Sequence, residues 1–292
     1  MRVMMAPEKL DGRHGAEQNN PMSRPARILL FDSGMGGLTV AAAVRATLPD
    51  AHLIYSADNA AFPYGAWDEP QLVRRIVAVV GKLIERARPD MVVIACNTAS
   101  TLAMNELREA YKLPFVGTVP AIKPAAAQTK SGLIGVLATP GTVKREYTQS
   151  LIHTYAFHCK VFLHGAKRLA EIAEAKLKGQ PPDMTELAAE ITPVFRTRDG
   201  KRTDVVVLGC THYPLLSAEI IAAAPWPVTY IDPAPAIARR VLDILPADRS
   251  GATEGPTHGT VILTSARKQT ADSLAAYGTM GFGAHEILEM PV

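Results

Sequence analysis

The sequence predicts an α/β protein made of two pseudo-symmetric α/β domains, each with a mainly parallel sheet. Short strands that are apolar throughout alternate with amphipathic helical segments, which is typical of parallel sheets covered on both faces. The pattern Asp-x-Val-Val-x-x-Cys occurs twice, ending at Cys96 and at Cys210. A weaker correspondence relates residues 28–34 to residues 134–141. The order turn, cysteine, turn, cysteine indicates two related halves that each contribute one cysteine.

The predicted elements alternate along most of the chain. Asp68 is of a residue type that caps helices, and Pro70 falls in the first turn that follows, where proline is tolerated. Polar and glycine residues over 248–259 indicate a loop. The expected strands cover 28–31, 52–56, 91–95, 133–137, 159–163, 205–208 and 261–264, with a strand-like stretch from Val116; the expected helices cover 38–48, the segment after Asp68, 97–111, 143–153, 169–177 and 184–194.

Composition excludes several classes of protein. With 48% hydrophobic and 20% charged residues, the 292-residue chain can bury a sizeable core. Its net charge of +3 is too small to indicate nucleic acid or an anionic membrane as a partner. No apolar run approaches the roughly 20 residues of a membrane span, and three cysteines make no disulfide framework, so we expect a cytoplasmic protein. Residues 1–26 lack the apolar segment of a secretory signal and are expected to form a flexible leader.

Both repeated cysteines follow an expected strand, at the end where parallel α/β sheets bind their ligands. Polar pairs come next, Asn97-Thr98 in one case and Thr211-His212 in the other. The dipole of a following helix favours the thiolate, so a lowered thiol pKa is expected at both positions. A cysteine can also be a small buried hydrophobe, and Cys159, inside an apolar strand, keeps that interpretation.

Other cysteine chemistries fit the spacing poorly. A cysteine phosphatase needs an arginine six residues after the nucleophile, where this chain has Leu102 and Leu216. There is no Cys-x-x-Cys, and Cys210 with His212 offers two metal ligands without a second pair, so no metal is expected. A papain-like Cys/His pair would leave the second cysteine idle. The glycines of 34–37 lack the spacing of a nucleotide-binding loop.

Two cysteines that face each other suit inversion at a carbon atom. A thiolate removes a proton from one face while a thiol delivers a proton to the other. Without a metal or a pyridoxal cofactor, preorganised donors and exclusion of water must stabilise the carbanion-like transition state. Asp32 and His212 are the expected helpers, with a turn aspartate and a structural histidine as the alternatives. The candidate hydroxyl donors are Ser33, Thr98, Thr139, Thr142 and Thr211.

Five segments, in the same order as in the family, resemble the glutamate racemases of the aspartate/glutamate racemase superfamily. They run through most of residues 28–240. None is specific alone, but together they are. The segments are Phe31-Asp-Ser-Gly-Met-Gly-Gly37, Pro63-Tyr64-Gly65, Ile94-Ala-Cys-Asn-Thr-Ala-Ser100, Ala138-Thr-Pro-Gly-Thr142 and Leu208-Gly-Cys-Thr-His-Tyr-Pro214.

The resemblance implies a cofactor-independent enzyme in which Cys96 deprotonates D-glutamate and Cys210 deprotonates L-glutamate. It implies that the D-glutamate serves peptidoglycan synthesis. The first domain is then expected over 27–118 and 229–292 and the second over 119–228, with the active site in the cleft between them. The implied substrate pocket comprises Asp32, Ser33, Tyr64, Gly65, Asn97, Thr98, Thr211 and His212, to which we add the hydroxyls of Thr139 and Thr142.

Two features depart from or qualify the resemblance. Many family members carry a glutamate where this chain has Lys167, and either Glu171 or Glu174 could take its place. No arginine lies within the matching segments, so a dicarboxylate is expected to be held by amide and hydroxyl donors.

Alternative functions are a racemase acting on aspartate or a hydantoin, and a racemase-fold binding protein such as an inhibitor of DNA gyrase. Two cysteines with polar neighbours argue against a purely non-catalytic role. A homodimer is compatible with the sequence.

Overall fold

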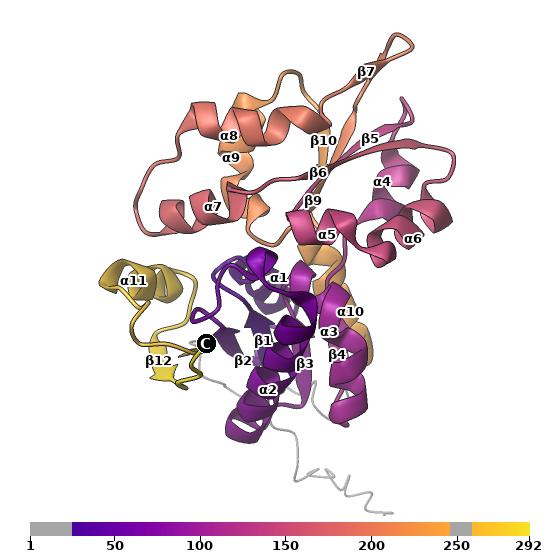
Figure 1. Cartoon of the computed structure of the whole chain (residues 1–292). Helices are drawn as coiled ribbons and strands as arrows, with labels where there is room; N and C mark the ends of the chain where they lie inside the picture. The colour runs from indigo at the N-terminus through magenta and orange to yellow at the C-terminus, as the bar shows by residue number, and fades with distance from the viewer. Residues whose placement is uncertain (1–24, 246–258) are drawn as a thin grey trace, which may run out of the picture.

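The computed structural model describes residues 25–245 and 259–292, so the expected leader, and nearly all of the expected loop over 248–259, lie outside the described residues. The described chain forms two lobes, each built around its own sheet (Figure 1). Every neighbouring pair of strands in both sheets is parallel. The first sheet has the order β12-β11-β2-β1-β3-β4, with bounds Ala284–Ile287, Thr260–Leu263, His52–Ala57, Arg27–Asp32, Met91–Ile94 and Phe115–Gly117.

The second sheet repeats the central part of the first. Its order is β10-β9-β5-β6, with bounds Thr229–Ile231, Val205–Gly209, Leu133–Ala138 and Lys160–Gly165. The order β2-β1-β3-β4 therefore corresponds to β6-β5-β9-β10. The two strands that precede Cys96 and Cys210, β3 and β9, hold the same place in their sheets. The predicted fold class, two related α/β units with parallel sheets, is confirmed.

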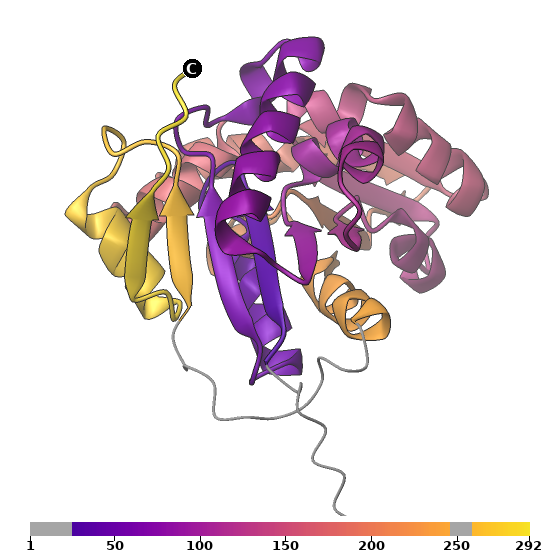
Figure 2. The same cartoon turned by 90° about the horizontal axis from the view of Figure 1, so that it is seen from below.

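Helices cover both faces of the first sheet because successive strand residues point to opposite sides. In β1, Ile28 and Leu30 belong to the core under α1 (Leu38–Thr47). Leu29 and Phe31 belong to the opposite core, under α2 (Glu69–Ala87) and α3 (Asn97–Ala110). Figure 2 shows the C-terminal strands β11 and β12, in orange and yellow, at one edge of this sheet. Helix α11 (Ala271–Thr279) connects them.

The two lobes exchange helices. Helix α4 (Ile122–Gln128) follows β4 of the first sheet but packs in the core of the second, against α6 (Glu146–Tyr155) and β9. Helix α10 (Ala234–Ile244) follows β10 of the second sheet but packs against α1 in the first lobe, as its position in Figure 1 shows. The core of each lobe is therefore completed by a helix that follows a strand of the other lobe's sheet.

Several expected boundaries differ from the structure. Strand β10 bonds to β9, so the chain leaves the second sheet after Ile231 rather than at residue 229. The expected helix over 143–153 is two helices, α5 (Pro140–Lys144) and α6, separated by Arg145 in an extended conformation. The remaining helices are α7 (Leu169–Leu177), α8 (Met184–Ile191) and α9 (Ser217–Ala223), and the hairpin β7–β8 (Thr197–Arg198 and Lys201–Arg202) stands apart. Among the helices of the described residues, none is long and apolar enough to cross a membrane.

Candidate active site

Asp32 joins the two lobes at the carboxyl end of β1. The side chain is fully buried, and one carboxylate oxygen accepts hydrogen bonds from the Ser33 hydroxyl at 3.2 Å and the Gly34 N–H at 3.0 Å. The other oxygen accepts from the hydroxyl of Thr211, in the second lobe, at 3.0 Å. The residue that ends the first strand is thus held by the residue that follows Cys210.

Cys96 lies one residue beyond the end of β3, at the N-cap of α3, and is 6% exposed. Its thiol lies 3.8 Å from the Ser33 hydroxyl. Burial, followed by the negative charge of Asp32, raises the pKa of the Cys96 thiol to about 12, although the Ala99 N–H at the helix start acts in the opposite direction. The expectation of a lowered thiol pKa at this position is wrong, because burial and Asp32 outweigh the effect of the helix start.

Cys210 lies directly after β9, is also 6% exposed, and has different partners. Its sulfur is 3.8 Å from Nδ1 of His212. On the other side of the ring, Nε2 of His212 lies 3.2 Å from a carboxylate oxygen of Glu174, which also accepts from the Met35 N–H at 2.9 Å. Cys210, His212 and Glu174 therefore form a buried chain of polar contacts.

The imidazole of His212 has a partner in either protonation state. The Gly36 N–H approaches Nε2 at 3.1 Å, so a deprotonated Nε2 accepts from Gly36 and a protonated Nε2 donates to Glu174. Burial opposes charge on the ring, but hydrogen bonds with Cys210 and Glu174 raise the pKa of His212 well above its ordinary value. Burial likewise opposes ionisation of Glu174, yet its bond to His212 leaves the pKa of Glu174 lowered. The structure thus favours a charged His212 beside an ionised Glu174.

Glu174, rather than Glu171, occupies the position that the sequence left open. Glu171 forms a surface ion pair with Arg168, and Lys167 is exposed. Both glutamates belong to α7, but Glu174 is on the buried face of the helix together with Leu169, Ile172 and Ala173.

Three threonine hydroxyls link the lobes on the Cys96 side. Thr98 lies 3.3 Å from Thr139, and Thr139 lies 2.9 Å from Thr142 while accepting its N–H as the cap of α5. A Cβ at Gly65 would be 4.0 Å from the Cβ of Thr139, so the exposed Gly65 lies opposite the start of α5. Three of the five hydroxyl donors predicted from the sequence are therefore near one another.

The side chain of Asn97 is already engaged by the protein. Its amide nitrogen donates to the Gly209 carbonyl at 2.7 Å, across the boundary between the lobes, and its oxygen accepts from the Thr118 hydroxyl at 3.0 Å. Asn97 therefore holds the ends of β3 and β9 together. Thr118, which holds Asn97 in turn, was not predicted from the sequence.

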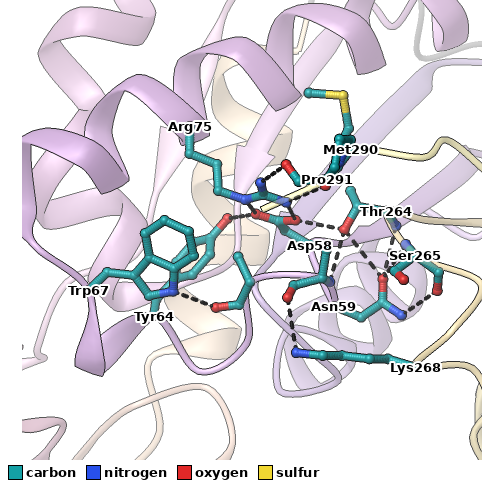
Figure 3. A network of polar contacts seen from close by, with 12 residues as sticks. Asp58, Asn59, Tyr64, Trp67, Arg75, Thr264, Ser265, Lys268, Met290 and Pro291 are labelled. Carbon is teal, nitrogen blue, oxygen red and sulfur yellow. Dashed lines mark hydrogen bonds and ion pairs between the residues drawn. The ribbon is translucent and has the colours of Figure 1, made fainter.

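Tyr64 is buried, and its hydroxyl donates to Asp58 at 2.6 Å (Figure 3). Asp58 is fully buried and forms a 2.7 Å ion pair with Arg75. Arg75 also donates to the carbonyls of Met290 and Pro291, near the end of the chain, at 2.9 and 3.0 Å. The Tyr64 hydroxyl is therefore held in a structural network of hydrogen bonds.

The geometry can be set beside known proteins. The sequence profile of the Asp/Glu/hydantoin racemases matches residues 38–241.

The chain belongs to this family.

A glutamate racemase from Brucella canis is 52% identical over 256 residues, covering 87% of this chain and 92% of the relative. The activity class of the present chain is therefore that of an amino-acid racemase, an isomerase.

Solved structures agree with this assignment. A glutamate racemase from Escherichia coli, in complex with L-glutamate and the activator UDP-MurNAc-ala, is 39% identical. It superimposes with a TM-score of 0.82, covering 91% of this chain and 99% of that one. A glutamate racemase isoform from Bacillus anthracis is 27% identical, with a TM-score of 0.77 and coverage of 92% and 99%.

Sequence reasoning identified most of the residues gathered between the lobes. Asp32, Ser33, Cys96 and Thr98 meet Thr139, Thr142, Cys210, Thr211 and His212 where the sheets' carboxyl ends face each other. The residues missed are Thr118, Asp58 and Arg75. One signal was available, since Asp58 directly follows β2 as Asp32 ends β1. No group of three or more His, Cys, Asp or Glu side chains in the described part of the chain is arranged to hold a metal ion.

Proposed function

We propose that the protein interconverts L- and D-glutamate without a cofactor, with Cys96 and Cys210 acting on opposite faces of the α-carbon. One observation carries this proposal: matching strands of two related sheets deliver two buried thiols to the same boundary, each with its own polar partners. The relatives of the chain are glutamate racemases, which supports glutamate as the substrate. Aspartate is the substrate of the sister activity against which this assignment is tested.

Proton transfer in one direction starts at Cys210. Its thiolate removes the α-proton of L-glutamate, and the thiol of Cys96 delivers a proton to the opposite face, leaving D-glutamate, a Cys210 thiol and a Cys96 thiolate. The reverse reaction exchanges the two roles. The charged His212 stabilises a thiolate at Cys210, and the high pKa of Cys96 keeps that thiol protonated. This arrangement would favour attack on L-glutamate.

Substrate binding uses the groups around the thiols. Asp32 would hold the substrate ammonium. The hydroxyls of Ser33, Thr98, Thr139, Thr142 and Thr211 and the backbone N–H groups of Tyr64-Gly65 would hold its carboxylates. Asn97 and His212 would complete the walls, between domains formed by 27–118 with the C-terminal segment and by the residues from 119 to the end of β10. The D-glutamate would supply peptidoglycan synthesis.

The first test is a chiral assay of purified protein on a panel of L- and D-amino acids that includes aspartate. We expect glutamate to racemise, with activity that survives metal chelation and without a pyridoxal absorption band. Activity that chelation abolishes and only metal restores would contradict the cofactor-free mechanism. Racemisation of aspartate alone would assign the protein to the sister activity.

The second test replaces each thiol with serine. Cys96→Ser and Cys210→Ser should each lose racemisation by about 100-fold or more, because a hydroxyl is a far poorer acid or base. In deuterated water, Cys210→Ser should retain some exchange of D-glutamate, and Cys96→Ser some exchange of L-glutamate. Cys159→Ser is the matched control, since Cys159 packs at the edge of the second core and should be dispensable. Near-normal racemisation without Cys96 or Cys210 would refute the two-thiol proposal.

A further inference from the structure

The positive charge of the chain is concentrated in one short segment. Residues 196–202 contain a single acidic side chain and four basic ones, Arg196, Arg198, Lys201 and Arg202. The other 27 basic and 27 acidic residues of the chain balance. All seven residues of the segment are exposed. The small net charge, which gave no indication of a nucleic acid partner, is therefore an average over a neutral remainder and one strongly basic segment.

This segment is a hairpin that belongs to neither main sheet. Strands β7 and β8 form a two-stranded sheet of their own, which projects from the second lobe at the end away from the first (Figure 1). Their pairing places Arg198 opposite Lys201, and like charges that face each other destabilise a β pair. Asp199, in the turn, lies 3.4 Å from Arg198, but both side chains are exposed, so water screens this ion pair. Folding gains little from these charges, which points to a negatively charged partner.

The base of the hairpin is held firmly by the second lobe. The hydroxyl of the buried Thr203 accepts from the Arg196 N–H and donates to the Val194 carbonyl, both at 3.0 Å. The indole of Trp226 donates to the Thr203 carbonyl at 2.8 Å, and the Arg202 guanidinium lies 5.3 Å from the centre of the Trp226 ring. A partner would therefore meet cations on an anchored support, where binding costs less ordering than on a free loop.

Two loops continue the positive charge across the second sheet. Asp204 directly follows the hairpin and accepts the Lys130 N–H, from the loop between α4 and β5, at 2.7 Å. Lys160 begins β6, on the far side of β5, and its N–H donates to the Gly132 carbonyl at 2.8 Å. The side chains of Lys130 and Lys160 are exposed. Since β9 and β6 are two strands apart, these groups lie within about 10 Å of one another across the sheet. We call residues 129–132, 156–160 and 196–202 together the basic rim.

The basic rim also presents an aromatic ring. Phe157 is 77% exposed, and the ring of His158 packs edge-on to it with 5.1 Å between centroids. Aromatic rings among cations fit single-stranded nucleic acid, because bases stack on the rings and phosphates bind the cations. A protein interface would need an apolar core depleted of charge, which this face lacks. A flat anionic membrane would first meet the acidic turn residue, Asp199.

We propose that the basic rim is a binding surface for single-stranded nucleic acid, in which the hairpin and loop cations neutralise phosphates and Phe157 stacks against a base. Contacts of these two kinds carry little base specificity, so binding should depend weakly on sequence. The rim lies at the amino ends of β9, β5 and β6, whereas Cys210 follows the carboxyl end of β9. Because the five residues of β9 span about 16 Å, a strand bound at the rim leaves the boundary between the lobes free.

The test measures fluorescence anisotropy of a labelled single-stranded DNA of about 20 nucleotides between about 50 and 200 mM salt. The double variant Arg198→Gln/Lys201→Gln should lose about 10-fold or more in affinity. Its salt slope should fall by about 1.4, since each phosphate contact of a single strand contributes about 0.7. Phe157→Ala should lose about 5-fold or more with an unchanged slope, because it removes stacking alone. Lys82→Gln/Arg86→Gln, which removes the same charge from exposed pairs on α2, should bind as the parent does.

The possible outcomes separate this surface from other roles. Absence of salt-dependent DNA binding by the parent protein, or an equal loss in the control variant, would overturn the proposal. Unchanged affinity in Phe157→Ala would overturn the assignment to single strands. Tighter binding to vesicles rich in phosphatidylserine, lost in the Arg198→Gln/Lys201→Gln variant, would assign the face to a membrane instead. All of these variants should racemise glutamate at the parental rate, so DNA binding without racemisation would refute only the proposed activity.

Discussion

At the scale of single residues, the two thiols differ more than their matching strands suggest. Cys96 faces the hydroxyl of Ser33 and the charge of Asp32, and its pKa is raised to about 12. Cys210 faces His212, whose pKa is raised, in spite of burial, by hydrogen bonds with Cys210 and Glu174. The duplicated framework therefore places two like groups in unlike surroundings. One thiol lies beside a hydroxyl and a carboxylate, and the other lies beside an imidazole.

Glu174→Gln should reduce stability and racemisation together. At pH 7 we expect the free energy of unfolding to fall by about 1–3 kcal/mol, since the charged His212 loses its buried ionic partner. The contribution of Glu174 to the free energy of unfolding is complete above its ordinary pKa of 4.5. It is lost as the pH falls through the lowered pKa of the folded state. The contribution of His212 to the free energy of unfolding is complete below its ordinary pKa of 6.5. It is lost as the pH rises through the raised pKa of the folded state.

The pair therefore contributes most between about pH 4.5 and 6.5, where both contributions are complete. Urea unfolding of the parent and of Glu174→Gln across this range measures the difference. Glu171→Gln, in the same helix but in an exposed pair with Arg168, is the control and should change stability little. Equal losses in the two variants would refute a special role for Glu174.

Motifs identified the site residues that stand at strand ends, because strand ends of parallel sheets converge. They could not choose between Glu171 and Glu174, since packing against the rest of the lobe decides which face of α7 is buried. The contact that Arg145 makes between the lobes gave no signal, because its partners Thr101 and Glu69 lie far away in the sequence. The pKa of Cys96 was predicted in the wrong direction, because burial depth and the proximity of Asp32 are properties of the folded chain.

At the scale of elements, the exchanged helices α4 and α10 join the lobes. Each follows an edge strand of one sheet and then covers the core of the other lobe. Apolar side chains from α10, among them Ile237 and Val241, share a core with Leu38 and Val44 of α1. We infer that the lobes unfold as one cooperative unit, since neither keeps its full core without the other.

Ile237→Ala tests this coupling. Ile237 is nearly fully buried against the first lobe, so the substitution should cost about 2–5 kcal/mol. Leu242→Ala, in the same helix but 47% exposed, should cost less than about 0.5 kcal/mol. Thermal unfolding followed by calorimetry should show one transition that moves to lower temperature in Ile237→Ala. Two separated transitions would mean that the lobes are independent.

Most long elements could be predicted, and the short ones could not. Periodicity detects the 19-residue helix α2 easily, but β10 has only three residues and the mostly exposed β12 has little apolar character. The break between α5 and α6 has no glycine or proline at Arg145 or Glu146 to reveal it. Tertiary contacts decide these features, as in the hydrogen bond between Arg145 and Thr101.

At the scale of the whole molecule, the C-terminal segment closes the first lobe and supports the wall of the site. Strand β12 protects the edge of β11, and the carbonyls of Met290 and Pro291 bind Arg75. Arg75 fixes Asp58, which in turn fixes Tyr64 beside the core that contains Cys96. A continuous set of contacts thus extends from the last residues of the chain to the surroundings of one thiol.

Deleting residues 284–292 should impair both stability and activity. The deletion removes β12 and two carbonyl acceptors of a charged donor, so we expect a loss of at least about 2 kcal/mol. Calorimetry and the chiral assay measure the two effects. Deleting Val292 alone removes an exposed residue and is the control. A shortened chain with parental melting temperature and kcat would show that the segment is dispensable.

The same arrangement sets an order of events during translation. The ribosome delivers β1 to β4 early, but the strand that pairs with the open side of β2 is among the last segments to emerge. Helix α10, which covers α1, also emerges only after the entire second sheet has been made. Until then, the nascent first lobe has an unpaired edge at β2 and an uncovered apolar face on α1. Interrupted synthesis should leave a fragment that aggregates and is sensitive to proteases. Only chains translated as far as the final strands should therefore form active enzyme.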